Sequence, residues 1–499
     1  MRNADEIIVV ITCLVLALPI FGCEGGREAV VAGIDPITNV ATVENNAQSL
    51  QAWIVNEARA DVLVHIDTSD DMAIFRGELR EGVENAADHL KRRNVDVIDR
   101  IAPFLERGGF INLGYLAGLY KRVIWVVPLK TSIGEAQFEG LKNFLMYRRG
   151  FQQSDLDDLA ITGTSVEGTF AGVPLTVTSL NDLTLGEETA ILDIDLSFFM
   201  GLKAQDPALQ IGTRSLLEFL RTVKDKHLRS SFVSVVLSTQ RQSVPMDMRF
   251  FGDIIREALS DPGNLGDRPP EKWSTVIAAE DSLVSGRYGE AEDLYELLVR
   301  NHPHDPGLRF ALAITRGYME KGKQCRQELL AAYRLDKEYI RGFFQLANVL
   351  AVRGKVSTGL EILETPELAT LVTSVDLDYG KGGFYLNAGR PGDALKYLEK
   401  TARMRPNDFF LYSLIYKANR AVGDERGMIE SLEKLLKIDE VRFGMEMPWA
   451  YKELGDVYEG EKLYGNAAEM YERYLKIVPD DSNAAVLNEK IRKFRETRR

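Results

Sequence analysis

Residues 451–481, "YKELGDVYEGEKLYGNAAEMYERYLKIVPDD", contain two amphipathic segments of helix length that are separated by a short polar turn. Gly455 and Ala467 are small, and small residues allow two helices to cross closely. The aromatic side chains of Tyr458 and Tyr471 can fill the space beside such a crossing. Pro479 cannot continue a helix, so it marks the end of the second segment. The stretch therefore predicts a helical hairpin.

The same arrangement recurs in residues 285–303 and 387–406, and weaker versions occupy residues 318–336, 351–364 and 421–439. Ala291 and Ala394 are separated by three repeats of about 34 residues, and Ala467 follows about two repeats later. This pattern resembles the tetratricopeptide repeat (TPR). We expect an all-α TPR solenoid of about six repeats over residues 271–499, ending in a basic capping helix, "NEKIRKFRETRR".

Stacked repeats of this kind bury their own apolar stripe and offer a groove to other molecules. The resemblance implies a protein or peptide partner in that groove. The alternatives are that the array packs only against the rest of the chain or forms a homo-oligomer. Cys325 falls near a helix-crossing position, where we expect a buried packing thiol and not a metal ligand.

Residues 30–262 have a different sequence pattern, in which short apolar runs alternate with amphipathic stretches. This alternation predicts an α/β domain with a mostly parallel sheet between layers of helices. A Pro/Gly-rich segment, "DPGNLGDRPPEKW", separates it from the repeats. The predicted strands cover residues 61–67, 121–128, 174–180, 190–199 and 231–238.

Two of these strands run into carboxylates. In "LVHIDTSDDM", residues 63–72, an apolar run precedes Asp67, Asp70 and Asp71, and "LDIDLSFF", residues 192–199, carries Asp193 and Asp195. Residues two apart on a strand share a face, so Asp193 and Asp195 can approach the first group. Several buried carboxylates repel one another unless they are protonated or share a cation. We therefore expect a divalent metal site or, alternatively, an acidic solvated loop.

The same two strands resemble the signatures of an uncharacterised protein family related to arginases, which have the three-layer α/β arginase/deacetylase fold. In arginases the corresponding segments hold two manganese ions, which activate a bridging water for attack on a carbon–nitrogen bond. The resemblance extends to the flanking stretches "TVENNAQSLQAW" and "FINLGYLAGLYKRVIWVVP". The residues that match the signatures are His65, Asp67, Asp71, Asp193 and Asp195.

The departures from the signatures remove imidazole and carboxylate ligands. Ser69 replaces a histidine, Ser197 replaces a third aspartate, and "ENN" at Asn45 and Asn46 stands where a histidine is expected. The remaining oxygen donors suit Mg²⁺, Mn²⁺ or Ca²⁺ better than Zn²⁺. His65 is either a general base or a buried core histidine. The metal ligands implied by the resemblance are Asp67, Asp71, Asp193 and Asp195, with Ser69, Ser197 or Asn45 as weaker donors.

The N-terminus resembles a bacterial lipoprotein signal. An apolar run at residues 7–21 is the length of a signal-peptide core, and "IFGC" resembles a lipobox that ends at Cys23. We expect residues 1–22 to be removed and Cys23 to be lipidated; the alternative is an uncleaved anchor. Both interpretations predict a membrane-tethered protein of the bacterial cell envelope that faces the periplasm or exterior.

A net charge of -13 argues against a nucleic-acid partner, since phosphate binding needs a basic surface. The sequence has no P-loop and no GxSxG nucleophile motif. We therefore expect a membrane-tethered, extracytoplasmic TPR protein that binds a protein or peptide. Its arginase-like domain would be a pseudoenzyme with a degenerate metal site. The alternative is a metal-dependent hydrolase of a carbon–nitrogen bond that uses Mn²⁺ or Mg²⁺.

Overall fold

The computed structural model describes residues 39–75, 77–105, 108–148, 151–239, 244–266, 268–479 and 481–496. The predicted signal peptide and the predicted lipidation site, Cys23, lie outside the described residues. Within the described part of the chain, no helix has both the length and the apolar character that a membrane span needs. The chain divides into two compact units, residues 1–142 with 152–345 and residues 143–151 with 346–499.

The first unit contains an eight-stranded mixed sheet in the order β1-β8-β7-β2-β3-β6-β5-β4. The strands from β1 to β6 in this order are parallel, and β5 runs antiparallel to both of its neighbours. The expected mostly parallel sheet is therefore confirmed, with an added antiparallel edge. The strands are β1 (Val40–Val43), β2 (Val62–Ile66), β3 (Arg122–Val127), β4 (Ala160–Thr162), β5 (Ser165–Phe170), β6 (Val173–Ser179), β7 (Thr189–Asp195) and β8 (Arg229–Val236).

The strand predicted over residues 190–199 was too long at its carboxyl end. β7 stops at Asp195, and α7 (Ser197–Gln205) begins two residues later. The side chain of Asp195 accepts a hydrogen bond from the backbone N–H of Ser197 at 2.7 Å, which satisfies a donor at the start of this helix. Phe198 and Phe199 are buried, and they belong to this helix and not to a strand.

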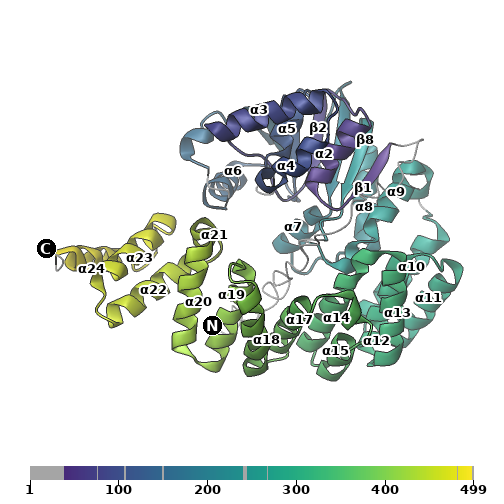
Figure 1. The fold of residues 1–499 in the computed structure, drawn as a ribbon. Coiled ribbons are helices and arrows are strands. Elements are labelled where there is room, and N and C mark those ends of the chain that lie inside the picture. Colours follow the sequence, from purple (N-terminus) through teal and green to yellow (C-terminus); the bar gives the residue numbers. More distant parts are fainter. Residues whose placement is uncertain are drawn as a thin grey trace. The chain divides into compact units, whose positions relative to one another are not determined.

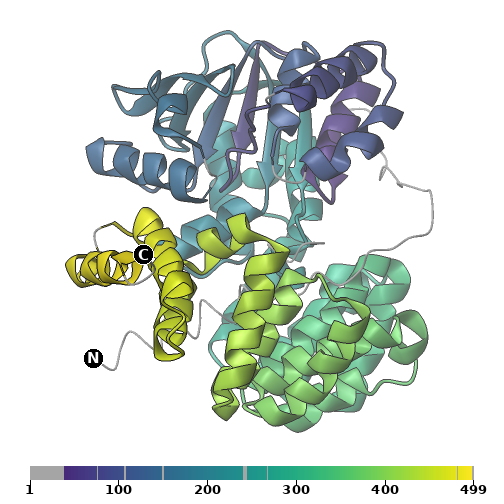
Figure 2. The same ribbon diagram turned by 60° about the vertical axis from the view of Figure 1, so that its left-hand side comes forward.

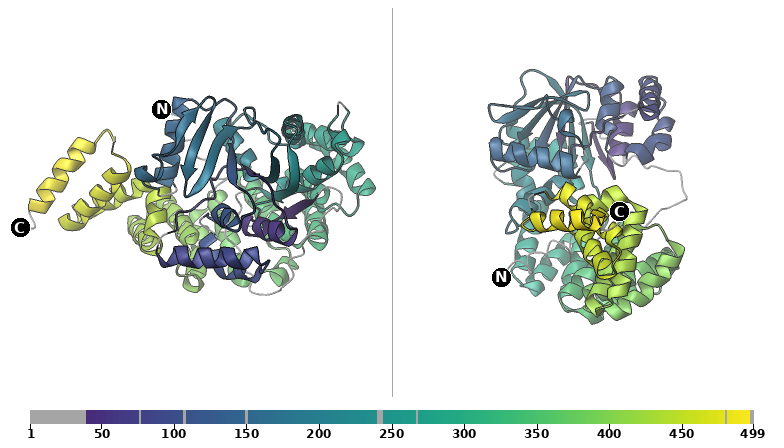
Figure 3. Two further views of the ribbon diagram at one scale, coloured as in Figure 1. Left: turned by 90° about the horizontal axis from the view of Figure 1, so that it is seen from above. Right: turned by 90° about the vertical axis from the view of Figure 1, so that its left-hand side faces the viewer.

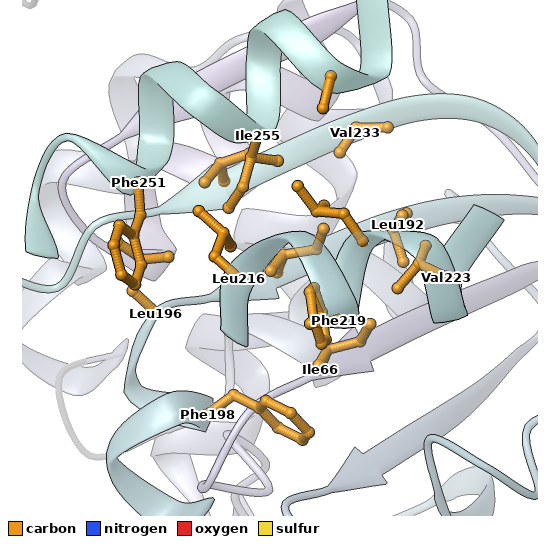
Figure 4. Close-up of a cluster of buried hydrophobic side chains, with 14 of the residues drawn as sticks. Ile66, Leu192, Leu196, Phe198, Leu216, Phe219, Val223, Val233, Phe251 and Ile255 are labelled. Carbon is orange, nitrogen blue, oxygen red and sulfur yellow. The ribbon is translucent and has the colours of Figure 1, made fainter. Parts of the chain in front are cut away.

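Helices cover both faces of the sheet (Figure 1, Figure 3). On one face, Trp53 of α2 donates from Nε1 to Ser234 Oγ of β8 at 3.0 Å. On the other, α8 and α9 bury Leu216, Phe219 and Ile255 against Val233 and its neighbours (Figure 4). The helices of this region are α2 (Asn46–Val55), α3 (Glu78–Lys91), α4 (Asp96–Leu105), α5 (Phe110–Leu116), α6 (Glu135–Asn143), α8 (Thr213–Asp225) and α9 (Phe251–Ser260), with short helical turns η2 (Gln153–Asp155), η3 (Met246–Met248) and η4 (Pro262–Leu265). The short helix η1 (Phe144–Arg148) belongs to the second unit.

Six helical hairpins follow among the described residues, and they confirm the predicted repeat array. The second helices of the hairpins begin at residues 288, 322, 356, 391, 425 and 464, so most repeats are 34 or 35 residues long. The short helix α21 (Glu440–Glu446) lengthens the last interval. The paired helices are α10 (Glu271–Val284) and α11 (Tyr288–Asn301), α12 (Pro306–Tyr318) and α13 (Gly322–Leu335), α14 (Ile340–Val352) and α15 (Val356–Leu363), α17 (Ser374–Asn387) and α18 (Pro391–Met404), α19 (Phe409–Val422) and α20 (Glu425–Ile438), and α22 (Pro448–Gly460) and α23 (Tyr464–Ile477).

The chain between and after these hairpins is also helical. α16 (Leu368–Leu371) and the turn η5 (Lys337–Tyr339) lie in connections, and α24 (Ala484–Glu496) follows the last hairpin. α24 packs on α23 through Leu487, Ile491 and Phe494, as expected of a capping helix (Figure 2). Cys325 is fully buried in α13, so the prediction of a packing thiol is confirmed.

The first two hairpins pack against the α/β domain within the first unit. Trp273 of α10 joins the apolar core beneath the sheet, and its Nε1 donates to Glu257 of α9 at 3.1 Å. Glu280, also on α10, accepts from the backbone N–H of Thr213 at the start of α8 at 2.9 Å. Gly307 of α12 lies so near Phe250 that an added Cβ would be 2.5 Å from the Phe250 Cβ. Part of the surface of these two hairpins is therefore covered by the α/β domain.

Candidate metal centre

The predicted site residues lie on neighbouring strands of the sheet. His65 on β2 is directly opposite Asp193 on β7, which in turn is opposite Ser234 on β8. Asp67 follows the end of β2, and Asp195 is the last residue of β7. Because these strands are parallel, their carboxyl ends meet at one edge of the sheet, as the sequence predicted.

The ring of His65 is fully buried, and both of its nitrogens face oxygen atoms. Nδ1 lies 2.9 Å from Asp193 Oδ2. Nε2 lies 3.1 Å from the carbonyl oxygen of Ser69, 3.6 Å from Asp67 Oδ2 and 3.5 Å from Asp71 Oδ2. One ring nitrogen is therefore held by Asp193, while the other points toward two predicted metal ligands.

Asp193 is engaged by protein groups through both carboxylate oxygens. Oδ2 contacts His65, and Oδ1 accepts hydrogen bonds from Ser49 Oγ at 3.1 Å and from Ser234 Oγ. All four side chains are buried. This arrangement suits a residue that orients a metal-binding histidine, since such histidines typically bind a carboxylate through their second ring nitrogen.

Asp67 and Asp195 are held near each other by Ser197. The Ser197 hydroxyl donates to Asp67 Oδ1, and its backbone N–H donates to Asp195 Oδ1 at 2.7 Å. Thr68 N–H also donates to Asp67 Oδ1 at 2.6 Å, and Ser238 Oγ donates to Asp195 Oδ2 at 2.6 Å. Ser197 thus serves as a hydrogen-bond donor to both Asp67 and Asp195.

Asp71 is positioned from two sides. Its backbone has a φ of 48°, and its carbonyl oxygen accepts from Gly109 N–H at 2.7 Å. Its Oδ2 accepts a hydrogen bond from Asn46 Nδ2. The other side-chain atom of Asn46, Oδ1, is buried and has no hydrogen-bond partner among the described residues. A buried carbonyl oxygen without a partner is costly, and a cation beside Asp71 would satisfy it.

His65, Asp67 and Asp71 each offer one ligand atom, and these atoms all lie within 4.8 Å of one another. This spacing brings one nitrogen and two carboxylate oxygens around a common point. Carboxylate and amide oxygens with a single imidazole suit Mg²⁺ or Mn²⁺, whereas zinc favours sites richer in nitrogen and sulfur. The residues present therefore fit one hard divalent cation.

The electrostatics of the cluster show its excess of negative charge. Burial, together with the charges of Asp195 and Asp71, raises the pKa of Asp67 well above its usual value. Burial also raises the pKa of Asp195, to about 7. For His65, burial alone would lower the pKa, but hydrogen bonds to Asp193 and Asp71 and the charge of Asp67 outweigh it and raise that pKa well above its usual value. Protons or a cation must balance these carboxylates.

Some residues of the site differ from those that the sequence indicated. Asn45, predicted as a weak donor, instead caps α2 by accepting from Gln48 N–H at 3.1 Å, and its neighbour Asn46 reaches Asp71. Asp70 is fully buried and accepts from Met72 N–H at 3.1 Å. Ser49, Ser234 and Ser238 were not predicted as site residues; a serine within the apolar strand "SFVSVV" was the available signal for Ser234.

No protein-family model matches the chain, and no curated protein matches it in sequence. Among solved structures, it is similar to YrrB, a TPR protein with an unusual peptide-binding site, at 16% identity over 39% of this chain and 97% of that chain, with a TM-score of 0.26. It is also similar to pilF of Pseudomonas aeruginosa, at 14% identity over 45% and 97% of the two chains, with a TM-score of 0.24.

A tetratricopeptide repeat protein from Parabacteroides merdae is a further match, at 12% identity over 56% of this chain and 98% of that chain, with a TM-score of 0.25. Similarities at this level carry no argument about activity or partner. The assignment of the helical part as a TPR array rests on its own hairpins and their spacing.

Proposed function

We propose that this protein is a membrane-tethered, extracytoplasmic repeat protein. Its helical array binds a protein or peptide, and its arginase-like α/β domain binds one divalent cation without hydrolysing a substrate. The proposal for the α/β domain rests on the different partners of the two ring nitrogens of His65. Asp67 and Asp71 lie near Nε2, while Asp193 contacts Nδ1.

A two-metal hydrolase needs ligands for two ions that together activate a water molecule. Asp193 already accepts from His65, Ser49 and Ser234, and Asp195 accepts from Ser197 and Ser238. The ligand atoms that lie within 4.8 Å of one another are those of His65, Asp67 and Asp71, which form one set, and Asp67 and Asp71 also accept hydrogen bonds from Ser197 and Asn46. One bound cation would neutralise part of the buried charge and stabilise the loop after β2. This supports a cation-stabilised domain over a binuclear catalyst.

The proposal for the array rests on exposed aromatic surface in the second unit. Trp449, at the start of α22, is 40% exposed, and its ring centroid lies 5.6 Å from that of Tyr416 on α19. The Tyr416 hydroxyl donates to Glu453 Oε2 at 2.9 Å. Tyr416 itself is buried, so the exposed aromatic group is Trp449, and an exposed tryptophan is typical of surfaces that hold peptides and proteins. All three residues lie on the first helices of the last two complete hairpins.

Metal stoichiometry tests the α/β domain. We expect purified residues 27–499 to bind one Mn²⁺ per chain by isothermal titration calorimetry, and to lose that binding in the double variant Asp67→Ala and Asp71→Ala. Two Mn²⁺ per chain together with hydrolysis of a guanidinium or amide substrate would instead establish the alternative, a hydrolase of a carbon–nitrogen bond. A protein that binds no Mn²⁺ or Mg²⁺ would contradict the cation-binding function.

Peptide display on the same protein tests the array. We expect selected peptides to lose about 10-fold or more in affinity for Trp449→Ala, as is typical of a tryptophan at the centre of an interface. Leu297→Ala is a matched control, because Leu297 is 41% exposed but lies on the second helix of the first hairpin. Peptides that bind both variants equally would contradict this placement of the binding surface.

A further inference from the structure

Arg249 joins two loops of the candidate metal centre to the second hairpin of the array. Its Nη2 lies 2.5 Å from Glu44 Oε1, its Nη1 donates to Thr239 Oγ1 at 3.0 Å, and its Nε donates to Asp336 Oδ2 at 2.7 Å. Only 10% of the Arg249 side chain is exposed. In such a site the removal of the guanidinium would leave two carboxylates poorly compensated.

Two of the three anchors belong to loops that build the metal centre. Glu44 precedes Asn45, which caps α2, and Asn46, which donates to Asp71. Thr239 follows Ser238, which donates to Asp195. Thr239 Oγ1 also donates to Glu44 Oε2 at 3.2 Å, so the two loops are linked directly as well. One guanidinium therefore fixes the segments that present both Asn46 and Ser238.

The third anchor comes from the helical array. Asp336 lies between α13 and α14, where its Oδ1 accepts from Glu338 N–H at 3.0 Å and starts the turn η5. A second contact lies nearby, since Met246 N–H donates to Gln345 Oε1 of α14 at 2.7 Å. The position of Arg249 is thus set in part by a hairpin connection outside the α/β domain.

We propose that Arg249 is a positioning residue for the cation site, and that Asp336 of the helical array sets the geometry of that site through it. This inference rests on the proposed binding of a cation. A ligand of the array that shifts Asp336 changes cation affinity, and by thermodynamic linkage the cation changes the affinity of that ligand by the same factor.

Calorimetric titration of the full chain with Mn²⁺ tests the proposal on Arg249→Gln and Asp336→Asn. The matched control is Arg316→Gln, because Arg316 is 12% exposed and pairs with Glu292, Glu296 and Glu328 wholly within the array. We expect about a 10-fold loss of affinity for Arg249→Gln and a smaller loss for Asp336→Asn, as for other residues that orient metal ligands. Wild-type affinity in both variants, or an equal loss in Arg316→Gln, would overturn the proposal.

Hydrogen exchange on the metal-free protein tests the positioning role of Arg249 independently of cation binding. We expect Arg249→Gln and Asp336→Asn to speed amide exchange in residues 44–49 and 234–239, while Arg316→Gln leaves those segments as in the wild type. If the wild type binds no Mn²⁺, the proposed cation function fails, and this exchange pattern still tests the positioning role of Arg249. Unchanged exchange in both segments would overturn that role.

Discussion

His65 and Asp193 face each other across two parallel strands, with 2.9 Å between Nδ1 and Oδ2. Asp193 is itself fixed by Ser49 and Ser234, which approach its other oxygen from α2 and β8. Three elements of the fold therefore determine the orientation of one imidazole ring. The consequence is that Nε2 faces Asp67 and Asp71, which is the orientation that a cation ligand needs.

Replacement of Asp193 by asparagine should weaken cation binding without removing a cation ligand. The amide cannot stabilise the same ring orientation and charge as the carboxylate, and changes of this kind typically cost about 10-fold to 100-fold in metal affinity. Calorimetric titration with Mn²⁺ measures the effect. Ser49→Ala is the graded control, since Asp193 keeps its hydrogen bond from Ser234, and we expect a smaller loss. Equal affinities for the wild type and Asp193→Asn would show that Asp193 does not orient His65 for a metal.

Replacement of Asp67 by asparagine should stabilise the metal-free protein and abolish its response to metal. Burial and the neighbouring carboxylates raise the pKa of Asp67 well above its usual value, so its ionised form is unfavourable in the folded state. We expect the metal-free variant to melt at a higher temperature than the metal-free wild type. Thermal melts with a chelator and with Mn²⁺ measure both effects. Asp88→Asn, at an exposed carboxylate of α3, should change neither melt.

The sequence predicted the central strands because they are buried on both faces and read as continuous apolar runs, as in "DVLVHID" and "KRVIWVVP". It missed β1, which has only four residues, and the β4–β5 hairpin, in which exposed residues weaken the apolar signal. The helical stretch that follows β2 is divided into α3 and α4, and Arg93 in the connection has a φ of 62°.

The aspartates and His65 could be found from the sequence because they follow recognisable strands at fixed spacing. Their partners could not, since Ser49 and Asp193 are 144 residues apart, and the contact depends on how α2 lies across the sheet. For the same reason, the different roles of Asn45 and Asn46 could not be predicted. Adjacent asparagines look equivalent in the sequence, and the start of α2 decides which one caps the helix and which one reaches Asp71.

Replacement of Glu280 by glutamine should stabilise the protein above neutral pH. Burial raises the pKa of Glu280 from 4.5 to about 7, so the folded state keeps a proton that the unfolded state loses between these values. Stability of the wild type therefore falls as pH rises through this window. We expect Glu280→Gln to unfold like the wild type near pH 4 and to be about 3 kcal/mol more stable at pH 8. Urea unfolding at both pH values measures this, and a difference that is independent of pH would contradict the assignment to ionisation.

Replacement of Cys23 by serine tests the predicted lipobox. We expect the wild-type protein, expressed in a bacterium with labelled palmitate, to incorporate the label and to fractionate with membranes. The serine variant lacks the thiol to which lipid is attached, so it should remain unlabelled. Label in the serine variant would rule out Cys23 as the attachment site, and an unlabelled wild type in the membrane fraction would favour an uncleaved anchor.

Replacement of Gly455 by alanine should destabilise the last complete hairpin. A Cβ at this position would lie 2.5 Å from Tyr471 Cε1. Tyr471 cannot move away freely, because it is buried and its hydroxyl donates to Asp456 at 2.7 Å and to Glu459 at 2.6 Å. We expect a loss of about 1 to 3 kcal/mol, the typical cost of overpacking a core, measured by hydrogen exchange of α22 and α23. Gly460→Ala in the same helix is the control, since nothing lies within 4 Å of its added Cβ, and it should leave exchange unchanged or slower.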